Sequence, residues 1–598
     1  MKSKKTSMVK RILSAFTAMV VLVMVMTPAT VMAAPTGELI ITNVRTDTTS
    51  LSGQTFKAYK VFDVDTVDPF TSEEDWIYEL TSEFAGMSAA MGYDIGAEFS
   101  NIGGAKSRWE IAADTRNFII DNAIAETGNV TAGEGEEVVY IEGLDEGYYL
   151  VTGYVSADGQ NVETNSTFVF VEPGAYKDVY INTDAPRFEK EVWDVGDEFD
   201  DEDLADWDNG GWCDFTDISI GDTARFKLQT NLPNLSNLPS DFDYTFIMHD
   251  SMSDGLTLDT DSIKVYVGGY IDRYMEEVDG GALLEEGVDY EVNLNPATHG
   301  GECYLEIDFL TIRDLSISEY QEQDGEQFSW KESIPIYVIY EAQLNGEAVS
   351  YDPGNPNAAS LEYSNSPYTT ETNTTIEDKA VVYTFGIDLV KYTGNASGDS
   401  LVFKQGEGIY EGETTVAGAE FSLFTESDGN TSRTALRFVC TDIGSDVTSA
   451  VYRLALPEES GTTRLVTPES GRINILGLDE ATYYLKEVKA PSGYKILEYD
   501  LMISPYFDFD WPDGYTGAPT DVINTMGSYW GVRYQGEPQN GAVWNDDPES
   551  DTYVRLKSIG DMRLPETGGS GTKAFICGGL ALMLVAGVIL IIRKKSTK

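Results

Sequence analysis

Short runs of alternating apolar and polar residues recur along almost the whole chain. They are rich in Val, Ile, Tyr, Phe and Thr and are separated by Gly, Asn and Asp turns. A period of two with turn residues at short intervals is typical of β-sandwich domains. Clear examples are residues 38–44, 167–171, 224–228, 335–341 and 482–488. Helical periodicity is confined to modest stretches such as 109–125. The pattern predicts an all-β protein of tandem immunoglobulin-like β-sandwich domains, with some helix in the N-terminal domain.

The strand pattern is interrupted at two polar linkers, near residues 183–186 and 370–378. A new strand pattern opens after each of them, and the first linker ends in a proline. These breaks predict an N-terminal domain over residues 34–185, a second domain over 186–380 and a third over 381–563. Each is long enough to bury a core of its own.

The first 33 residues have the three zones of a secretory signal. Lys and Arg residues within positions 2–11 precede an apolar run over 12–26, and small residues follow up to Ala33. The apolar run is too short for a membrane span and ends in Thr27-Pro28. We therefore expect residues 1–33 to be a signal peptide that is removed during export.

The C-terminus also has three parts. The motif Leu564-Pro565-Glu566-Thr567-Gly568 comes first, followed by mostly apolar residues over 574–592 and then by Arg593-Lys594-Lys595. An apolar stretch of this length is just long enough to cross a bilayer, and the basic tail belongs on the cytoplasmic side. The sequence predicts a membrane span over 574–592, with the rest of the chain facing outward.

The net charge of the chain narrows its possible binding partners. The chain has 100 acidic and 40 basic residues and a net charge of −60, which argues against nucleic acid as a partner. The segment 194–217 is intensely acidic, but its spacing matches no calcium-binding loop, so a solvated insertion is the favoured interpretation. We expect no metal and no cofactor.

Cys213 and Cys303 can pair only if the geometry of the second domain brings them together.

Four short segments follow one another along the second domain. They are Phe188–Val192 with Lys190 at its centre, Ile220–Thr223, His249–Leu256 with Asp250, and Gly354–Asn365 with Asn357. Together they resemble the isopeptide-forming domain of Gram-positive major pilins.

The third domain has Asp388–Lys391, Ala417–Phe421 and Tyr484–Tyr494, and it resembles a collagen-adhesin B-type (SpaA-like) pilin module. The tripartite C-terminus resembles the sorting signal of sortase substrates. The N-terminal domain matches pilins only loosely, through Ala58–Phe62 and Glu146–Val151.

The resemblance implies an internal amide between a lysine and an asparagine. A buried ammonium loses hydration, its pKa falls, and the neutral amine becomes a nucleophile, while a nearby protonated carboxyl group polarises the asparagine side chain. In the second domain the resemblance assigns Lys190 as nucleophile, Asp250 as the acid and Asn357 as acceptor, with Asn365 as the alternative.

In the third domain the resemblance assigns Lys391 and Glu487. The strand before the sorting motif reads Val554–Ser558 and offers no asparagine, so either Asn524 serves as acceptor or the domain has lost its cross-link.

For the C-terminus the resemblance implies that a sortase cleaves between Thr567 and Gly568. The Thr567 carbonyl then passes to an amine of a peptidoglycan precursor or of another pilin subunit. The chain is the substrate of this reaction and is not itself an enzyme. Shaft-forming pilins carry an acceptor lysine in the first linker, where this chain has Asn182; Lys177 lies five residues upstream.

Two functions are consistent with these features. The first is a cell-wall-anchored fimbrial, pilin-type structural subunit that is exported, sorted and stiffened by isopeptide bonds. The second is a singly anchored adhesin that does not polymerise and binds host or neighbouring-cell ligands through exposed loops such as the acidic insertion.

Overall fold

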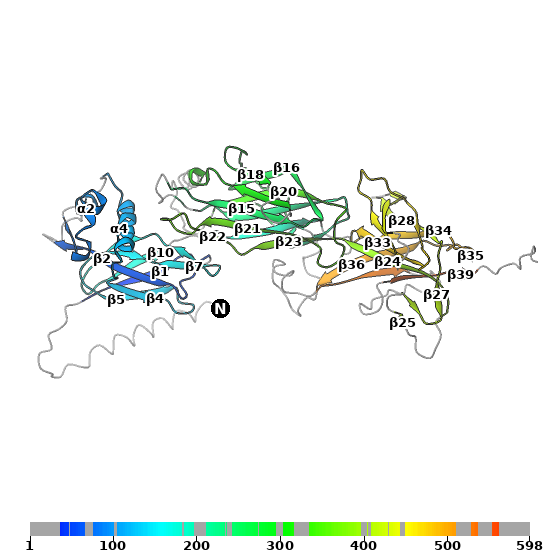
Figure 1. Cartoon of the computed structure of the whole chain (residues 1–598), viewed down its shortest axis with the longest axis horizontal. Helices are drawn as coiled ribbons and strands as arrows, with labels where there is room; N and C mark the ends of the chain where they lie inside the picture. The colour runs from blue at the N-terminus through cyan, green and yellow to red at the C-terminus, as the bar shows by residue number, and fades with distance from the viewer. Residues whose placement is uncertain are drawn as a thin grey trace, which may run out of the picture. The chain divides into compact units, whose positions relative to one another are not determined.

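The computed structural model describes most of the chain between residues 36 and 560 (Figure 1). The described ranges exclude residues 47, 66–75, 101–104, 182–184, 196–210, 234, 236–241, 273, 295–302, 316–333, 396–402, 405–407, 428–429, 443–448, 510–527 and 536–552. The described residues form two compact units. The first contains residues up to Ala185 together with Asn365–Thr369, and the second contains Pro186–Ser364 and the chain from Thr370 onward.

The first unit is built from two larger sheets, a separate two-stranded sheet and a small group of helices. Its strands are β1 (Gly37–Asn43), β2 (Thr55–Asp65), β3 (Ile77–Leu80), β4 (Gly128–Thr131), β5 (Val138–Leu144), β6 (Gly147–Thr152), β7 (Tyr154–Ala157), β8 (Gln160–Glu163), β9 (Thr167–Val171) and β10 (Tyr176–Ile181). One sheet has the order β10-β1-β5, and the other has the order β3-β2-β6-β9 with β4 beside β2.

The helices of this unit cover the second sheet. They are η2 (Ser82–Phe84), α2 (Met87–Met91), α3 (Ile95–Ser100) and α4 (Arg108–Asn122). Ser107 begins α4 with a capping box, in which its hydroxyl accepts from the Glu110 N–H and the Glu110 side chain accepts from the Ser107 N–H. Apolar residues of the helices pack on β2, β3 and β6 in one core that includes Phe62, Phe99 and Ile111. The helix expected at 109–125 is therefore present as α4.

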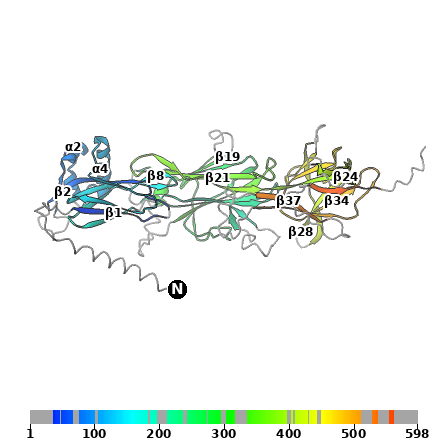
Figure 2. The same cartoon turned by 90° about the horizontal axis from the view of Figure 1, so that it is seen from below.

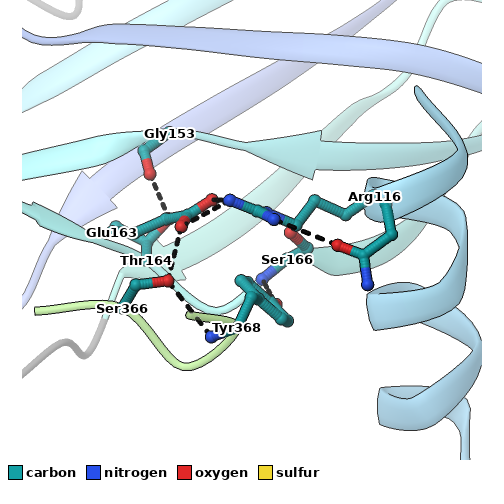
Figure 3. Close-up of polar contacts among 8 residues, drawn as sticks. Arg116, Gly153, Glu163, Thr164, Ser166, Ser366 and Tyr368 are labelled. Carbon is teal, nitrogen blue, oxygen red and sulfur yellow. Dashed lines mark hydrogen bonds and ion pairs between the residues drawn. The ribbon is translucent and has the colours of Figure 1, made fainter. Parts of the chain in front are cut away.

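A buried ion pair links α4 to β8. The Arg116 guanidinium donates to both carboxylate oxygens of Glu163, at 2.6 and 2.7 Å, and both side chains are less than a tenth exposed. Figure 3 shows Ser366 and Tyr368 completing this network. The Ser366 hydroxyl donates to Glu163 at 2.7 Å, and the Tyr368 ring lies under the guanidinium. Residues 365–369 are thus an integral part of the first unit.

Replacing Glu163 with Ala is expected to destabilise the first unit by about 3–5 kcal/mol, because the Arg116 charge stays buried without its partner. Hydrogen exchange followed by mass spectrometry should show the loss as protection of α4 that falls by roughly a hundredfold or more. The control is Lys106→Ala, which removes the partly exposed pair that Lys106 forms with Asp114 of the same helix and should cost about 1 kcal/mol or less. Equal losses in the two variants would contradict this account.

The second unit begins with a sandwich of two sheets, here called the middle sandwich (Figure 2). One sheet has the order β12-β11-β14-β20-β16-β17, and the other has the order β13-β23-β21-β15-β19-β18 with β22 beside β21. The strands are β11 (Phe188–Asp194), β12 (Gly211–Cys213), β13 (Phe215–Asp217), β14 (Thr223–Asn231), β15 (Phe246–Met252), β16 (Leu256–Val267), β17 (Ala282–Leu283), β18 (Glu291–Leu294), β19 (Cys303–Asp308), β20 (Pro335–Leu344), β21 (Asn355–Ser364), β22 (Thr372–Thr374) and β23 (Asp378–Tyr383).

A second sandwich of the same unit, here called the C-terminal sandwich, follows directly. Its main sheets have the orders β27-β24-β33-β31-β30, with β38 beside β24, and β29-β28-β34-β36-β37, with β32 beside β28. The strands are β24 (Phe385–Gly394), β25 (Phe403–Lys404), β26 (Ile409–Tyr410), β27 (Glu413–Thr415), β28 (Glu420–Ser427), β29 (Asn430–Ala435), β30 (Phe438–Asp442), β31 (Ala450–Leu454), β32 (Leu465–Val466), β33 (Arg472–Leu478), β34 (Tyr483–Lys489), β35 (Tyr494–Lys495), β36 (Leu501–Phe509), β37 (Ser528–Gln535), β38 (Tyr553–Lys557) and β39 (Ile559–Gly560).

This architecture confirms the predicted all-β class with helices in the N-terminal part. All five of the strands expected from alternation are present, and β9 has the expected bounds. The predicted boundaries of three domains stay a prediction.

The two sandwiches of the second unit meet at the turn after β33. The Glu480 N–H donates to Asp217 Oδ2 at 2.9 Å, and the Ile220 N–H donates to the Gly477 carbonyl at 3.0 Å. Burial and the neighbouring charge and hydrogen bond of Asp479 raise the pKa of Asp217 well above its ordinary value of 3.8. Asp194 adds to this effect, and the Glu480 N–H opposes it.

The raised pKa predicts a pH-dependent contact. A carboxyl that holds its proton more tightly when folded stabilises the contact fully below about pH 4, and this contribution is lost as the pH rises toward the raised value. Replacing Asp217 with Asn removes the titration, so hydrogen exchange at residues 479–483 should be slower than in the wild type at pH 8 and equal to it at pH 4. The exposed Asp261→Asn variant serves as control. The same difference at both pH values would contradict the prediction.

Candidate functional site

The candidate site lies between the two sheets of the middle sandwich and begins with Lys190. Residues of β11 alternate between core and surface, and this alternation points Lys190 and Val192 inward. The Lys190 side chain is fully buried. Its ammonium lies 5.2 and 5.4 Å from the ring centroids of Phe226 and Tyr340. The end of the lysine side chain is thereby held near two aromatic rings in a core that excludes water.

Three side chains from three other strands converge on this lysine. Lys190 Nζ donates to Asp250 Oδ2 on β15 at 2.5 Å and to the Tyr340 hydroxyl on β20 at 2.7 Å. The Asn357 amide on β21 donates to the same hydroxyl at 2.9 Å. Because β11 and β20 belong to one sheet while β15 and β21 belong to the other, the four residues join both halves of the sandwich.

The electrostatics of the site favour a reactive amine. Burial lowers the pKa of Lys190, and the charge and hydrogen bond of Asp250 only partly oppose this effect. A lower pKa increases the fraction of neutral amine, which is the nucleophilic form. Lys190 is also fixed through its backbone, since its N–H donates to Asp378 Oδ2 at 2.8 Å.

Two oxygens of the cluster have no hydrogen-bond donor among the described residues. They are Asp250 Oδ1 and Asn357 Oδ1, and both are buried. A buried acceptor without a donor costs free energy. Satisfying both oxygens requires a donor that the described side chains do not supply in this arrangement.

The two acceptors suggested by the sequence lie in different places. Asn357 is in the cluster, whereas Asn365 belongs to the first compact unit, where its backbone carbonyl accepts from the Glu163 N–H at 2.8 Å. The fold places Asn357 in the cluster around Lys190.

Tyr340 is the site residue that sequence reasoning missed. Strand β20 is buried on both faces, because Tyr340 points into the sandwich while Tyr337 packs with Trp212 and Ile271 on the other side. Alternation along the sequence could indicate that these tyrosines face opposite ways, but it could not tell which one faces Lys190.

The C-terminal sandwich holds a second buried pair. Lys391 on β24 and Glu487 on β34 come from opposite sheets, and Lys391 Nζ lies 2.9 Å from Glu487 Oε1. Both side chains are fully buried, and burial lowers the pKa of Lys391. Strand β38 runs parallel to β24 and places Leu556 beside Lys391. The proposed acceptor Asn524 lies outside the described residues.

Several other predicted features also fall outside the described residues. These are the signal peptide 1–33, the linker position Asn182, the motif 564–568 and the span 574–592. Within the part of the chain that is described, no helix has the length and apolar character needed to cross a membrane.

Cysteine and metal chemistry add little to the site. The Cys213 thiol is buried and lies 2.9 Å from the Phe215 carbonyl oxygen, and the side chain of Cys303 is not among those described. The described residues contain no cluster of His, Cys, Asp and Glu that could hold a metal ion.

Comparison with known families identifies two segments of the chain. Residues 410–504 match the SpaA family, described as a prealbumin-like fold domain. Residues 562–598 match the LPXTG cell wall anchor motif. The first segment holds Glu487, and the second begins just before the predicted sorting motif.

Known proteins with similar sequence or structure are surface and pilus proteins. The trypsin-resistant surface T6 protein of Streptococcus pyogenes serotype M6 is 24% identical over 294 residues, which cover 46% of this chain and 40% of that protein. The T6 backbone pilin structure of the same serotype has a TM-score of 0.48 at 14% identity, covering 89% of this chain and all of that one. The major pilin SpaA of Corynebacterium diphtheriae has a TM-score of 0.39 at 13% identity, covering 88% and 100%.

The fold and the anchor motif define a cell-wall-attached surface protein. The matches also confirm the expected resemblance to LPXTG-anchored, pilin-type proteins. The matched region spans less than half of the streptococcal relative.

Proposed function

We propose that this chain is a fimbrial, pilin-type structural subunit that a sortase attaches to the cell wall or to other subunits, and that a Lys190–Asn357 isopeptide bond stiffens it. The observation that carries the proposal is the buried contact network of Lys190, Asp250, Tyr340 and Asn357. Lys190 and Asn357 each react once within their own chain, so the protein is a structural component and not an enzyme.

The reaction is an amide exchange within the core. The neutral Lys190 amine attacks Cγ of Asn357, the new C–N bond forms, and the asparagine nitrogen leaves as ammonia. Asp250 holds the lysine at 2.5 Å and supplies the carboxyl group that polarises the asparagine carbonyl. No cofactor takes part, because every group required belongs to the chain.

The bond would join the two sheets of the middle sandwich. Lys190 is on β11, the first strand of the second unit, and Asn357 is 167 positions further along the chain. By the loop-entropy argument developed for disulfides, closing a loop of this length stabilises the folded state by about 5 kcal/mol. A covalent tie between the sheets also lets tension pass through the subunit without loading the hydrogen bonds between strands.

For the C-terminal sandwich we propose a second bond from Lys391 to Asn524, with Glu487 as the assisting carboxyl group. The buried ion pair of Lys391 and Glu487 supports this assignment, because it pairs a lysine with a carboxylate on the facing sheet, as the middle sandwich does. The alternative is that this pair persists without a cross-link.

Export and sorting complete the proposed function. The sortase would cleave between Thr567 and Gly568 and transfer the Thr567 carbonyl to an amine of peptidoglycan precursor or of another subunit. Lys177 is a candidate amine in this chain, because it is exposed on β10, an edge strand of its sheet. A subunit without a usable lysine would be attached singly and could act as an adhesin for host or neighbouring-cell ligands.

Intact-mass measurement of recombinant residues 34–563 tests the cross-links. Each isopeptide bond removes one ammonia, about 17 Da, so we expect two losses in the wild type and one in each of Lys190→Ala and Lys391→Ala. The exposed Lys264→Ala variant should keep both losses. A single loss tied to Lys190 would refute the bond in the C-terminal sandwich, and the absence of any loss would refute the isopeptide mechanism as a whole.

Denaturing gels of cell-wall extracts distinguish the pilus subunit from the single adhesin. A polymerising subunit gives a ladder of covalent multimers, and Lys177→Ala is expected to abolish that ladder, while Lys264→Ala leaves it intact. A ladder that survives Lys177→Ala would exclude Lys177 as the acceptor. A wild type that gives one band only would favour the adhesin.

A further inference from the structure

The Tyr340 hydroxyl lies at the centre of the reacting groups. It accepts from Lys190 Nζ at 2.7 Å and from Asn357 Nδ2 at 2.9 Å, and it donates to Asp250 Oδ2 at 2.5 Å. Among the described residues, no other side chain hydrogen-bonds to the lysine, the carboxyl group and the asparagine together. The tyrosine is fully buried, so bulk water does not compete for these bonds.

The leaving group is the Asn357 side-chain nitrogen, and Asp250 does not hydrogen-bond to it in this geometry. An amide nitrogen is a poor leaving group unless it receives a proton as the C–N bond breaks. The hydrogen-bond contact of Asn357 Nδ2 is the Tyr340 hydroxyl, whereas Asp250 reaches that hydroxyl through Oδ2. A proton can therefore travel from Asp250 to the leaving nitrogen through Tyr340.

We propose that Tyr340 is a catalytic residue of the cross-linking reaction and relays a proton from Asp250 to the departing ammonia. The inference rests on the proposed isopeptide bond. The reaction starts with Lys190 as the amine and Asp250 carrying a proton. Nζ bonds to Cγ of Asn357, and the Tyr340 O–H passes its proton to Nδ2 as the Cγ–Nδ2 bond breaks.

The remaining proton transfers restore the catalytic groups. Tyr340 regains a proton from the Asp250 carboxyl group, and the resulting carboxylate takes one proton from the attacking Lys190 nitrogen. The products are the secondary amide, one ammonia, a neutral tyrosine and a protonated Asp250. No oxidant, metal or outside acid is required, and both Asp250 and Tyr340 return to their starting forms.

A space-filling role alone does not explain the hydroxyl. The Tyr340 ring stacks on Phe226, with centroids 5.5 Å apart and planes 22° apart, and a phenylalanine would keep this contact. Burying a hydroxyl group is unfavourable unless hydrogen bonds compensate for the lost water. This hydroxyl hydrogen-bonds to the side chains of Lys190, Asp250 and Asn357.

The decisive variant is Tyr340→Phe, because it removes one oxygen and leaves the aromatic packing in place. Newly synthesised residues 34–563 are quenched in acidic denaturant at intervals, and the loss of about 17 Da tied to Lys190 is followed by intact mass. We expect the rate to fall by roughly a hundredfold or more, the usual effect of losing a general acid. Tyr337→Phe, from the opposite face of β20, removes a hydroxyl that bonds to backbone at Ile271 and should leave the rate unchanged.

A second measurement separates proton relay from positioning. The wild-type reaction should slow in D₂O because protons move in the rate-limiting step, and this isotope effect should shrink in Tyr340→Phe. Circular dichroism and hydrogen exchange at β20 must show that the variant is folded.

The possible failures are distinguishable. A wild type without any mass loss refutes the isopeptide proposal itself. A wild type that cross-links at the same rate as Tyr340→Phe overturns the relay alone. A slower variant with an undiminished isotope effect would assign Tyr340 a positioning role and would also overturn the relay.

Discussion

The burial of one lysine between two β-sheets constrains the rest of this structure. An ammonium group inside an apolar core must pair, lose its proton or react, because its hydration is gone. In the middle sandwich, Lys190 has a carboxyl group and a tyrosine hydroxyl as hydrogen-bond partners, and the carboxamide of Asn357 bonds to the same hydroxyl. The cost of enclosing the charge is thus the feature on which the proposed covalent bond depends.

The sandwich fold supplies the required alignment without any loop. Lys190 and Tyr340 come from one sheet, Asp250 and Asn357 from the other, and strand register fixes each along its own axis. Rigid strands place reacting atoms more reproducibly than loops do. The C-terminal sandwich repeats the principle with Lys391 and Glu487 on facing sheets. The proposed cross-links between sheets would suit a chain that bears tension when it is attached to the cell wall by its C-terminus.

Sequence reasoning predicted the fold class and most of the site, for identifiable reasons. Period-two alternation revealed the strands, and the motifs around Lys190, Asp250 and Asn357 indicated residues that the fold does bring together. Strand order and side-chain direction are set by tertiary packing, so the sequence could not choose Asn357 over Asn365 or reveal Tyr340. It also could not show that residues 365–369 join the first unit, because their contacts with Arg116, Glu163 and Ser166 span long sequence separations.

The most direct test of the central claim is tandem mass spectrometry of proteolysed mature protein. The account predicts a branched peptide in which the Lys190 ε-nitrogen is joined to the Asn357 side-chain carbonyl, with no free amine at Lys190. Linear peptides that carry an unmodified Lys190 and an intact Asn357 amide would contradict it.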